Sequence, residues 1–140
     1  MSTEQNKRNV RRGFEEAINQ RKLDLFDELM APNYVNHNMP MPQPGPAGMK
    51  AVLGMFITAF PDFHVTVEDV IGEGELASSR GYFTGTHQGD FQGIPPTGKQ
   101  VKVGYIDMWR AENGMLVENW VQLDMVGLLQ QLGVMPAPGQ

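Results

Sequence analysis

The chain has 140 residues and a formal net charge of −5, with 16 acidic side chains against 11 lysines and arginines. This length predicts a single domain over 1–140 with frayed tails at 1–6 and 135–140, because domains commonly hold about 100–150 residues. The acidic balance argues against nucleic acid and anionic membranes as partners, since both select for basic surfaces. The absence of cysteine excludes disulfides, a thiolate nucleophile and cysteine-based zinc sites.

The N-terminal stretch MSTEQNKRNVRRGF is polar and lacks the apolar core of a signal peptide. No uninterrupted apolar run approaches the roughly 18 residues of a membrane-spanning helix. We therefore expect a cytoplasmic protein.

Helical patterns dominate the first half of the chain. A first helix is expected after a cap at Ser2 or Thr3, with apolar residues recurring at Val10, Phe14, Ala17 and Ile18. A second short helix is expected over 23–30, and a third from about Pro46 to Phe60. The proline-rich stretch 32–46 between them predicts an ordered loop, because proline is excluded from helix interiors and central strands.

After Pro61 the apolar period changes from 3.6 to 2, which is typical of strands. Strands are expected over 63–71, 76–86, 101–110 and 115–124, followed by a short helix over 125–132. Helices segregated from antiparallel strands predict an α+β fold. We expect a cone-shaped α+β barrel, in which three N-terminal helices pack on a strongly curved antiparallel sheet whose inner face forms a pocket.

The second half also carries longer motifs: GTHQGDFQGIPPTGKQV, the hairpin ENGMLVENWVQLD and the helix MVGLLQQLG. Together with YVNHN after the second helix, they resemble the SnoaL-like polyketide cyclase (ester cyclase) family, over about residues 7–134. The resemblance implies the cone-shaped fold of the nuclear transport factor 2-like superfamily. It also implies intramolecular aldol ring closure of an aromatic polyketide ester without a metal or organic cofactor. The superfamily includes isomerases, dehydratases and epoxide hydrolases, so the fold does not decide the reaction.

The resemblance further implies the site residues. Asp124 matches the acidic residue that acts as acid and base on a late strand, and His37 and His87 match histidines at the mouth or wall of the pocket. Tyr34, in YVNHN, is expected to contact substrate. By the same resemblance, the open face of the sheet is expected to pair two copies into a homodimer.

Glu118, Trp120, Gln122 and Asp124 share one face of the last strand, because side chains alternate along a strand. That face either borders a pocket or faces solvent, and the resemblance favours the pocket. In an apolar pocket, burial would raise the pKa of a carboxyl group and suit it to acid–base chemistry. Asp124 also directly precedes the apolar MVGLL run, where it is equally suited to cap the last helix.

Several other residues have two interpretations. His37 lies in a polar loop and either lines the pocket or is a surface residue, while His87 either contacts substrate or fixes the glycine-rich connection that it begins. Arg80 either points inward, paired with Glu118 or Asp107, or faces solvent. The histidine spacing matches no metal motif.

Methionines are unusually frequent, at 10 of 140 residues. Met49, Met55, Met108 and Met125 either line an adaptable cavity or fill an ordinary core.

Two hypotheses follow. The first is a cofactor-independent acid–base catalyst that acts on a small hydrophobic carbonyl compound by ring closure, isomerisation or a related reaction. Its catalytic residues would be Asp124, His37 and His87, and its substrate contacts Arg80, Trp120, Glu118, Gln122 and Tyr34. The second is a non-catalytic module of the same fold that binds a small hydrophobic ligand or dimerises. Polar chemistry inside the pocket distinguishes them.

Overall fold

The N-terminal helix begins at a side-chain cap. In the computed structural model, which describes residues 2–136, helix α1 spans Thr3–Arg12 and continues without a break into a π-helical segment, Gly13–Ile18. The Ser2 hydroxyl accepts a hydrogen bond from the Gln5 backbone N–H at 3.0 Å, as expected for an N-cap. The tail expected over 1–6 is therefore helical from Thr3, whereas 137–140 of the expected C-terminal tail lie outside the described residues.

The two following helices form where the apolar spacing predicts them. A 3₁₀ turn, Leu23–Leu25, leads into α2, Phe26–Leu29, and after a loop α3 spans Gly45–Ala59. Pro46 occupies the first turn of α3, where its missing N–H leaves no bond unmade. One face of α3 is buried against the sheet.

Strand β1, Met30–Asn36, corrects the prediction of a loop from residue 32 onward. It pairs in parallel with β5, Met115–Leu123, with Met30 opposite Leu116 and Val35 opposite Glu118. Because β1 is an edge strand, Pro32 has no second neighbour to which it must donate a ladder hydrogen bond.

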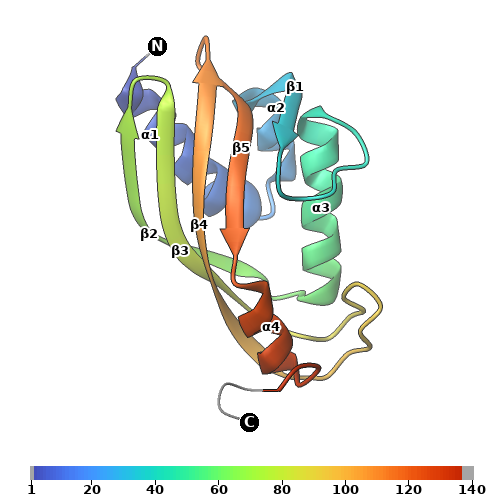
Figure 1. The fold of residues 1–140 in the computed structure, drawn as a ribbon. Coiled ribbons are helices and arrows are strands. Elements are labelled where there is room, and N and C mark those ends of the chain that lie inside the picture. Colours follow the sequence, from blue (N-terminus) through green and yellow to red (C-terminus); the bar gives the residue numbers. More distant parts are fainter. Residues whose placement is uncertain (1, 137–140) are drawn as a thin grey trace.

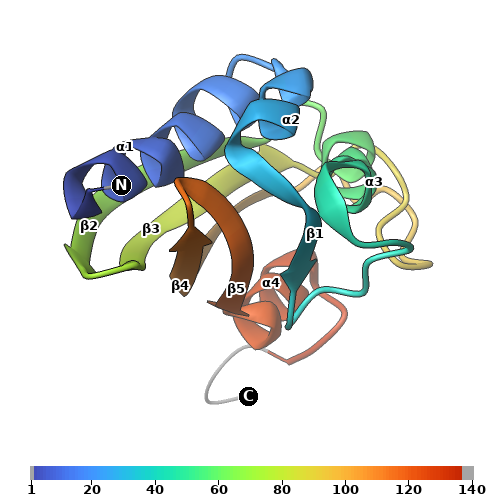
Figure 2. The same ribbon diagram turned by 90° about the horizontal axis from the view of Figure 1, so that it is seen from above.

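The remaining strands confirm the expected antiparallel sheet. They are β2, His64–Glu73, β3, Leu76–Thr86, and β4, Gln100–Glu112. The sheet order is β1-β5-β4-β3-β2, and helix α4, Met125–Leu132, follows β5 directly. The long strands bend along their length, and α1, α2 and α3 lie on the same side of the sheet (Figures 1 and 2). The chain therefore has the predicted α+β cone.

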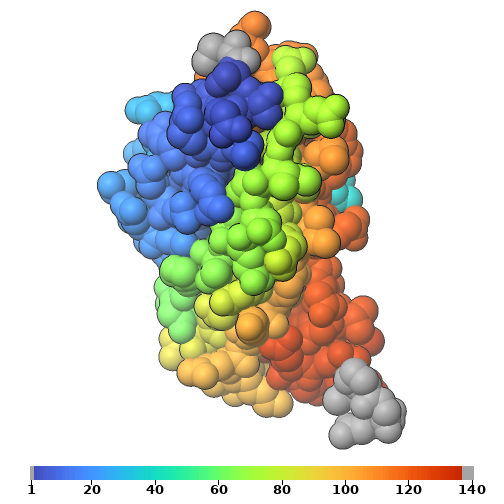
Figure 3. All heavy atoms as spheres, turned by 90° about the vertical axis from the view of Figure 1, so that its left-hand side faces the viewer, coloured from blue at the N-terminus to red at the C-terminus, as the bar shows by residue number. Residues whose placement is uncertain are grey.

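Helix α1 packs along the β2–β3 hairpin, and Figure 3 shows its surface directly beside that of β2. The Thr3 hydroxyl donates to the Gly74 carbonyl at 2.9 Å at one end of this contact. At the other end, the Asn19 amide exchanges two 2.8 Å hydrogen bonds with the backbone of Val65. These bonds fix the helix against the sheet at both ends, so the space beneath it has a defined shape.

Strand alternation decides which side chains enter that space. On β4, Tyr105, Asp107 and Trp109 are buried, whereas Ile106 and Met108 between them are exposed on the outer face.

Within residues 2–136, no helix is long and apolar enough to cross a membrane.

Candidate functional site

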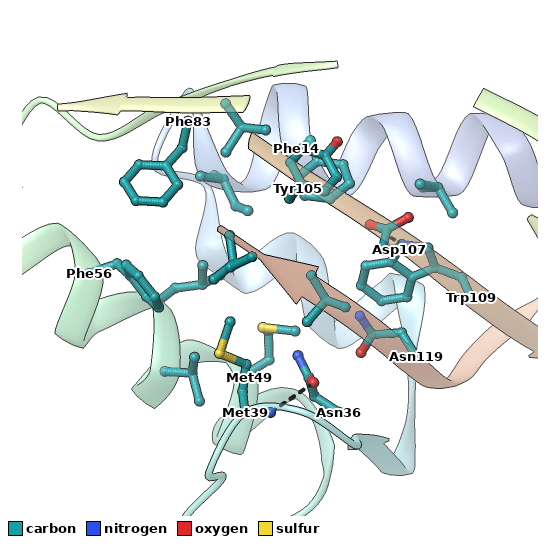
Figure 4. Close-up of a pocket in the computed structure, with 18 of the residues that line it drawn as sticks. Phe14, Asn36, Met39, Met49, Phe56, Phe83, Tyr105, Asp107, Trp109 and Asn119 are labelled. Carbon is teal, nitrogen blue, oxygen red and sulfur yellow. Dashed lines mark hydrogen bonds between the residues drawn. The ribbon is translucent and has the colours of Figure 1, made fainter. Parts of the chain in front are cut away.

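A cavity of about 100 Å³ lies between the helices and the inner face of the sheet (Figure 4). Most of its wall is apolar, and seven aromatic side chains line it: Phe14, Phe26, Phe56, Phe63, Phe83, Tyr105 and Trp109. The polar side chains Asn36, Asp107 and Asn119 also line it. The part of the wall formed by residues 2–136 contains no lysine, arginine or histidine. The cavity is thus suited to a small, mostly apolar and uncharged molecule.

Asp107 is the only carboxylate among these lining residues of the described chain, and its residue is 4% exposed. Its Oδ1 accepts hydrogen bonds from the Ser79 backbone N–H at 2.9 Å and the Ser79 hydroxyl at 2.7 Å. Its Oδ2 accepts one from Trp109 Nε1–H at 2.9 Å. These donors hold the carboxyl group in one orientation on the cavity wall.

Burial raises the pKa of the Asp107 carboxyl to about 6, because desolvation disfavours the carboxylate more than the Ser79 and Trp109 donors favour it. Burial also raises the pKa of the neighbouring Tyr105 to about 12, so that phenol stays protonated. Asp107 can therefore gain or lose a proton close to neutral pH, which is the property that acid–base catalysis requires.

A carboxylate offers about four lone-pair sites for hydrogen bonds. Ser79 and Trp109 together occupy three of them, two on Oδ1 and one on Oδ2. The unoccupied site is therefore on Oδ2, and this oxygen is the one available to a molecule in the cavity.

Tyr34, an expected substrate contact, lies one layer behind the cavity wall. It is fully buried, and its ring stacks on Trp109 with centroids 6.0 Å apart. Its hydroxyl hydrogen-bonds to Asn119 Oδ1. Burial and the nearby Asp107 charge raise the pKa of this phenol. Tyr34 thus reaches the cavity through Asn119 and does not line it directly.

Asp124 caps α4 outside the cavity. Its Oδ1 accepts a hydrogen bond from the Gly127 backbone N–H at 2.9 Å. With Arg80 and Gln122 it lines a separate, open hollow of the sheet. The structure therefore corrects the expected pocket-facing placement of Asp124 and Gln122, because alternation along β5 turns Asn119 and Val121 inward instead.

Glu118, Trp120 and His37 form a cluster on the outer face of the sheet. His37 Nε2–H donates to Glu118 Oε1 at 2.7 Å, and its ring stacks on Trp120 with centroids 5.0 Å apart. Arg110 pairs with the other oxygen of Glu118, and both partners lower the pKa of that carboxyl, Arg110 more than His37. None of these groups lines the cavity. The expected pocket positions of Glu118 and Trp120 are therefore corrected, and His37 has the surface position that was one of its two predicted placements.

His87 is completely buried but is not part of the cavity wall. Its Nδ1 accepts a hydrogen bond from the Thr97 backbone N–H at 3.2 Å, and its backbone bonds to Gly98 and Lys99. The ring therefore fixes the β3–β4 connection, which is one of its two predicted roles.

Arg80 faces outward and pairs with Asp69 at 2.6 Å, and not with Glu118 or Asp107. The catalytic roles of Asp124, His37 and His87 stay predictions, and all three residues lie outside the cavity wall.

Sequence reasoning missed Asp107 and Asn119 as site residues, although their strands carry the signal. Asp107 is in phase with the apolar Val103, Tyr105 and Trp109. A polar residue in the buried phase of a strand is the feature that marks a site. Of the methionines considered, Met49 lines the cavity, whereas Met108 is on the outer face.

A family model for SnoaL-like polyketide cyclases matches residues 8–132. The chain belongs to this family. Comparison with curated proteins gives no match.

Solved structures agree with this assignment and with a nuclear transport factor 2-like fold. TsrD from Streptomyces laurentii is 27% identical with a TM-score of 0.87, and the match covers 96% of this chain and 99% of that one. IdmH from Streptomyces antibioticus, a proposed polyketide cyclase, is 33% identical with a TM-score of 0.79, covering 92% and 99%. AclR from Streptomyces galilaeus, a proposed hydroxylase, is 26% identical with a TM-score of 0.84, covering 99% and 87%. The functions proposed for these relatives differ, so the reaction has to be argued from the site.

The raised pKa of Asp107 predicts how stability depends on pH. The native state holds this proton up to about pH 6, against an ordinary value of 3.8, so the free energy of unfolding falls as pH rises through this interval. The loss amounts to about 3 kcal/mol for a shift of this size. The Asp107→Asn variant lacks this ionisable group, so its stability does not include this loss. The wild-type free energy of unfolding minus that of the variant should therefore fall by most of this amount, about 2.4 kcal/mol, between pH 4 and 7 in urea denaturation.

Asp62→Asn provides a control of opposite sign. The Thr86 backbone N–H donates to Asp62 at 2.6 Å and lowers the pKa of that carboxyl, so its stabilisation is lost as pH falls. A wild-type minus Asp107→Asn difference that is constant from pH 4 to 7 would contradict the raised pKa of Asp107.

Proposed function

We propose that this SnoaL-like protein catalyses cofactor-independent acid–base chemistry on a small hydrophobic carbonyl compound bound in the cone, with Asp107 as the acid and base. The observation that carries the proposal is the position of Asp107: a desolvated carboxyl with one lone-pair site left unused by the described residues, in a mostly apolar cavity. Aldol ring closure and isomerisation both begin with removal of a proton next to a carbonyl group, so the same residue serves either reaction.

The geometry assigns a role to each neighbour of Asp107. Ser79 and Trp109 hold the carboxyl group and leave Oδ2 free to take a proton from carbon. When Oδ2 is protonated, the same oxygen can return the proton to carbon or oxygen of the substrate. The apolar wall excludes water, and the raised pKa that follows from it makes the carboxylate a stronger base.

The cavity also limits the substrate. Its volume of about 100 Å³ is below the range of about 300–1,000 Å³ that is usual for drug-sized ligands. It is closer to the engineered cavity of about 150 Å³ that binds benzene in another protein. A compound with one ring therefore suits this conformation better than a polycyclic polyketide does. The aromatic side chains favour a planar molecule.

We also propose that two copies pair through the outer face of the sheet. Four residues on this face are paired in sequence across β5, β4, β3 and β2: Trp120, Met108, Ser78 and Ile71. Ile106 is the next outward-facing residue along β4 from Met108. Ile71 on β2 and Ile106 on β4 are 68% and 61% exposed, a large apolar exposure for two residues on the same face of one sheet. A twofold axis through this face would bury the same patch on both copies.

Hydrogen exchange next to a carbonyl group tests the catalytic proposal. In D₂O, acetophenone, phenylacetone and cyclohexanone are incubated with the protein, and deuterium incorporation is followed by NMR. At least one should exchange faster than in buffer, and Asp107→Asn should lower that rate by about 10²–10⁴-fold, the usual contribution of a general base. The wild-type rate should rise with pH and reach half its maximum near pH 6, because the base must be ionised.

Asp124→Asn is the matched control, because it keeps a good helix cap and lies outside the cavity. It should exchange at the wild-type rate, and loss of exchange in this variant would instead support the catalytic role predicted for Asp124. If the ketones bind but neither the wild type nor either variant accelerates their exchange, the non-catalytic alternative would be favoured.

Ile106→Glu tests the proposed dimer. Replacing this exposed apolar side chain of the outer face by a charge should weaken association by about 30-fold, or about 2 kcal/mol, measured by sedimentation equilibrium. Ala51→Glu is the control, because this exposed position lies on α3, on the helical side of the sheet. A wild-type protein that is monomeric at all concentrations would contradict the proposal.

A further inference from the structure

Asn119 is the second polar group beside the proposed base. It lies on the inner face of β5, is 2% exposed and lines the cavity. In the sheet register Asn119 is opposite Trp109, and Asp107 is opposite the adjacent inward residue, Val121. The Asn119 amide and the Asp107 carboxyl are therefore diagonal neighbours at one end of the cavity, as Figure 4 shows.

The hydrogen bond from Tyr34 determines which way this amide points. The Tyr34 hydroxyl donates to Asn119 Oδ1, so the Asn119 oxygen faces Tyr34 and the Nδ2 amino group is directed away from it. Tyr34 is itself flanked by the Asn36 side chain, whose oxygen accepts from the backbone N–H groups of Asn38 and Met39 at 3.0 and 3.1 Å. The Asn36 oxygen is occupied by these bonds, so its amide nitrogen is the group directed at Tyr34.

The amide nitrogen of Asn119 has no hydrogen-bond partner among residues 2–136. This nitrogen is also accessible, because it is not among the fully buried side-chain atoms that lack a partner. In residues 2–136 those atoms are Asn6 Oδ1 and His87 Nε2. Asn119 therefore presents an unused N–H donor to the cavity. A donor of this kind requires an acceptor oxygen on whatever binds there.

The surrounding charge restricts that acceptor. Asp107 is the neighbouring ionisable group and becomes negative above about pH 6, while the described cavity wall contains no cationic side chain. A carboxylate or phosphate ligand would be repelled, whereas a neutral carbonyl oxygen would satisfy the N–H without that cost.

We propose that Asn119 binds the carbonyl oxygen of a neutral one-ring ketone, and that Tyr34 is a positioning residue that fixes the orientation of the Asn119 amide. This inference rests on the proposed function and names the substrate's point of attachment. Asp107 Oδ2 takes the proton from the carbon next to the carbonyl. The C–H electron pair then forms the C=C bond of an enolate, and the C=O π pair moves to oxygen. Asn119 N–H stabilises that oxygen, and the proton returns from Asp107 to carbon.

Infrared spectroscopy of acetophenone labelled with ¹³C at the carbonyl tests the contact directly. A hydrogen bond to oxygen lowers the C=O stretching frequency. The band of the ketone bound to the wild type should therefore lie below its position in hexane. Asn119→Leu should return the band to the hexane position and lower kcat/KM for deuterium exchange by about 10²–10³-fold, the usual effect of losing one such donor. Tyr34→Phe keeps the ring but frees the amide, so it should broaden the band and lower the rate by a smaller factor.

The buried control is Asn9→Leu, whose amide bonds to Gln5 and Gly114 outside the cavity wall, and which should leave both the band and the rate unchanged. If circular dichroism shows that Asn119→Leu does not fold, the Tyr34→Phe band decides. This inference would be overturned if Asn119→Leu and Tyr34→Phe both kept the wild-type exchange rate and the wild-type C=O band. If that exchange still required Asp107, the proposed function would remain intact. A bound ketone whose exchange does not require Asp107 would overturn the proposed function, and no ketone binding at all would overturn both.

Discussion

A carboxylate buried in an apolar cone has to be held by hydrogen-bond donors, and adjacent strands provide them for Asp107. Ser79 on β3 donates twice and Trp109 on β4 donates once, at 2.7–2.9 Å. These bonds require the two strands to stay in one register and the aromatic wall to stay closed over them. The pKa of the Asp107 carboxyl is raised to about 6 because these donors replace the lost water only in part. The geometry of the site therefore depends directly on the pairing of β3 with β4.

The two faces of the sheet have different chemistry. On the inner face, the described residues that line the cavity include one carboxylate beside neutral amides and aromatic rings, whereas the outer face carries the ion pairs of Arg80 and Arg110. On the outer face water and counter-ions weaken each pair, so these contacts contribute little to stability. Inside the cone the same charges would interact more strongly, and the cavity wall formed by residues 2–136 carries one carboxylate, that of Asp107.

Local patterns were sufficient to predict most of the fold. The change of period after Pro61, the Asn113–Gly114 turn and the cap at Asp124 are all short-range signals, and the structure confirms each of them. Strand β1 could not be found in this way, because it is stabilised by parallel pairing with β5, more than 80 residues later in the chain. Pro32 also argued against a strand, and only the edge position of β1 makes proline acceptable there.

The site shows a different limit. Alternation correctly separated Glu118, Trp120, Gln122 and Asp124 from the other face of β5, but it cannot say which face is inside. The apolar Val121 and Leu123 mark the inner face, and with them Asn119. The role of Tyr34 is a contact between β1 and β5, so it depends on the pairing that the sequence did not reveal.

Everything proposed for this site depends on Asp107 being a desolvated carboxyl group on the wall of a cavity that a ligand can enter. Titration of the ¹³C-labelled Asp107 carboxyl by NMR, with and without acetophenone, tests it most directly. We expect a midpoint near pH 6 that moves further upward when the ketone displaces the remaining water. A midpoint near pH 4 that acetophenone does not change would contradict it.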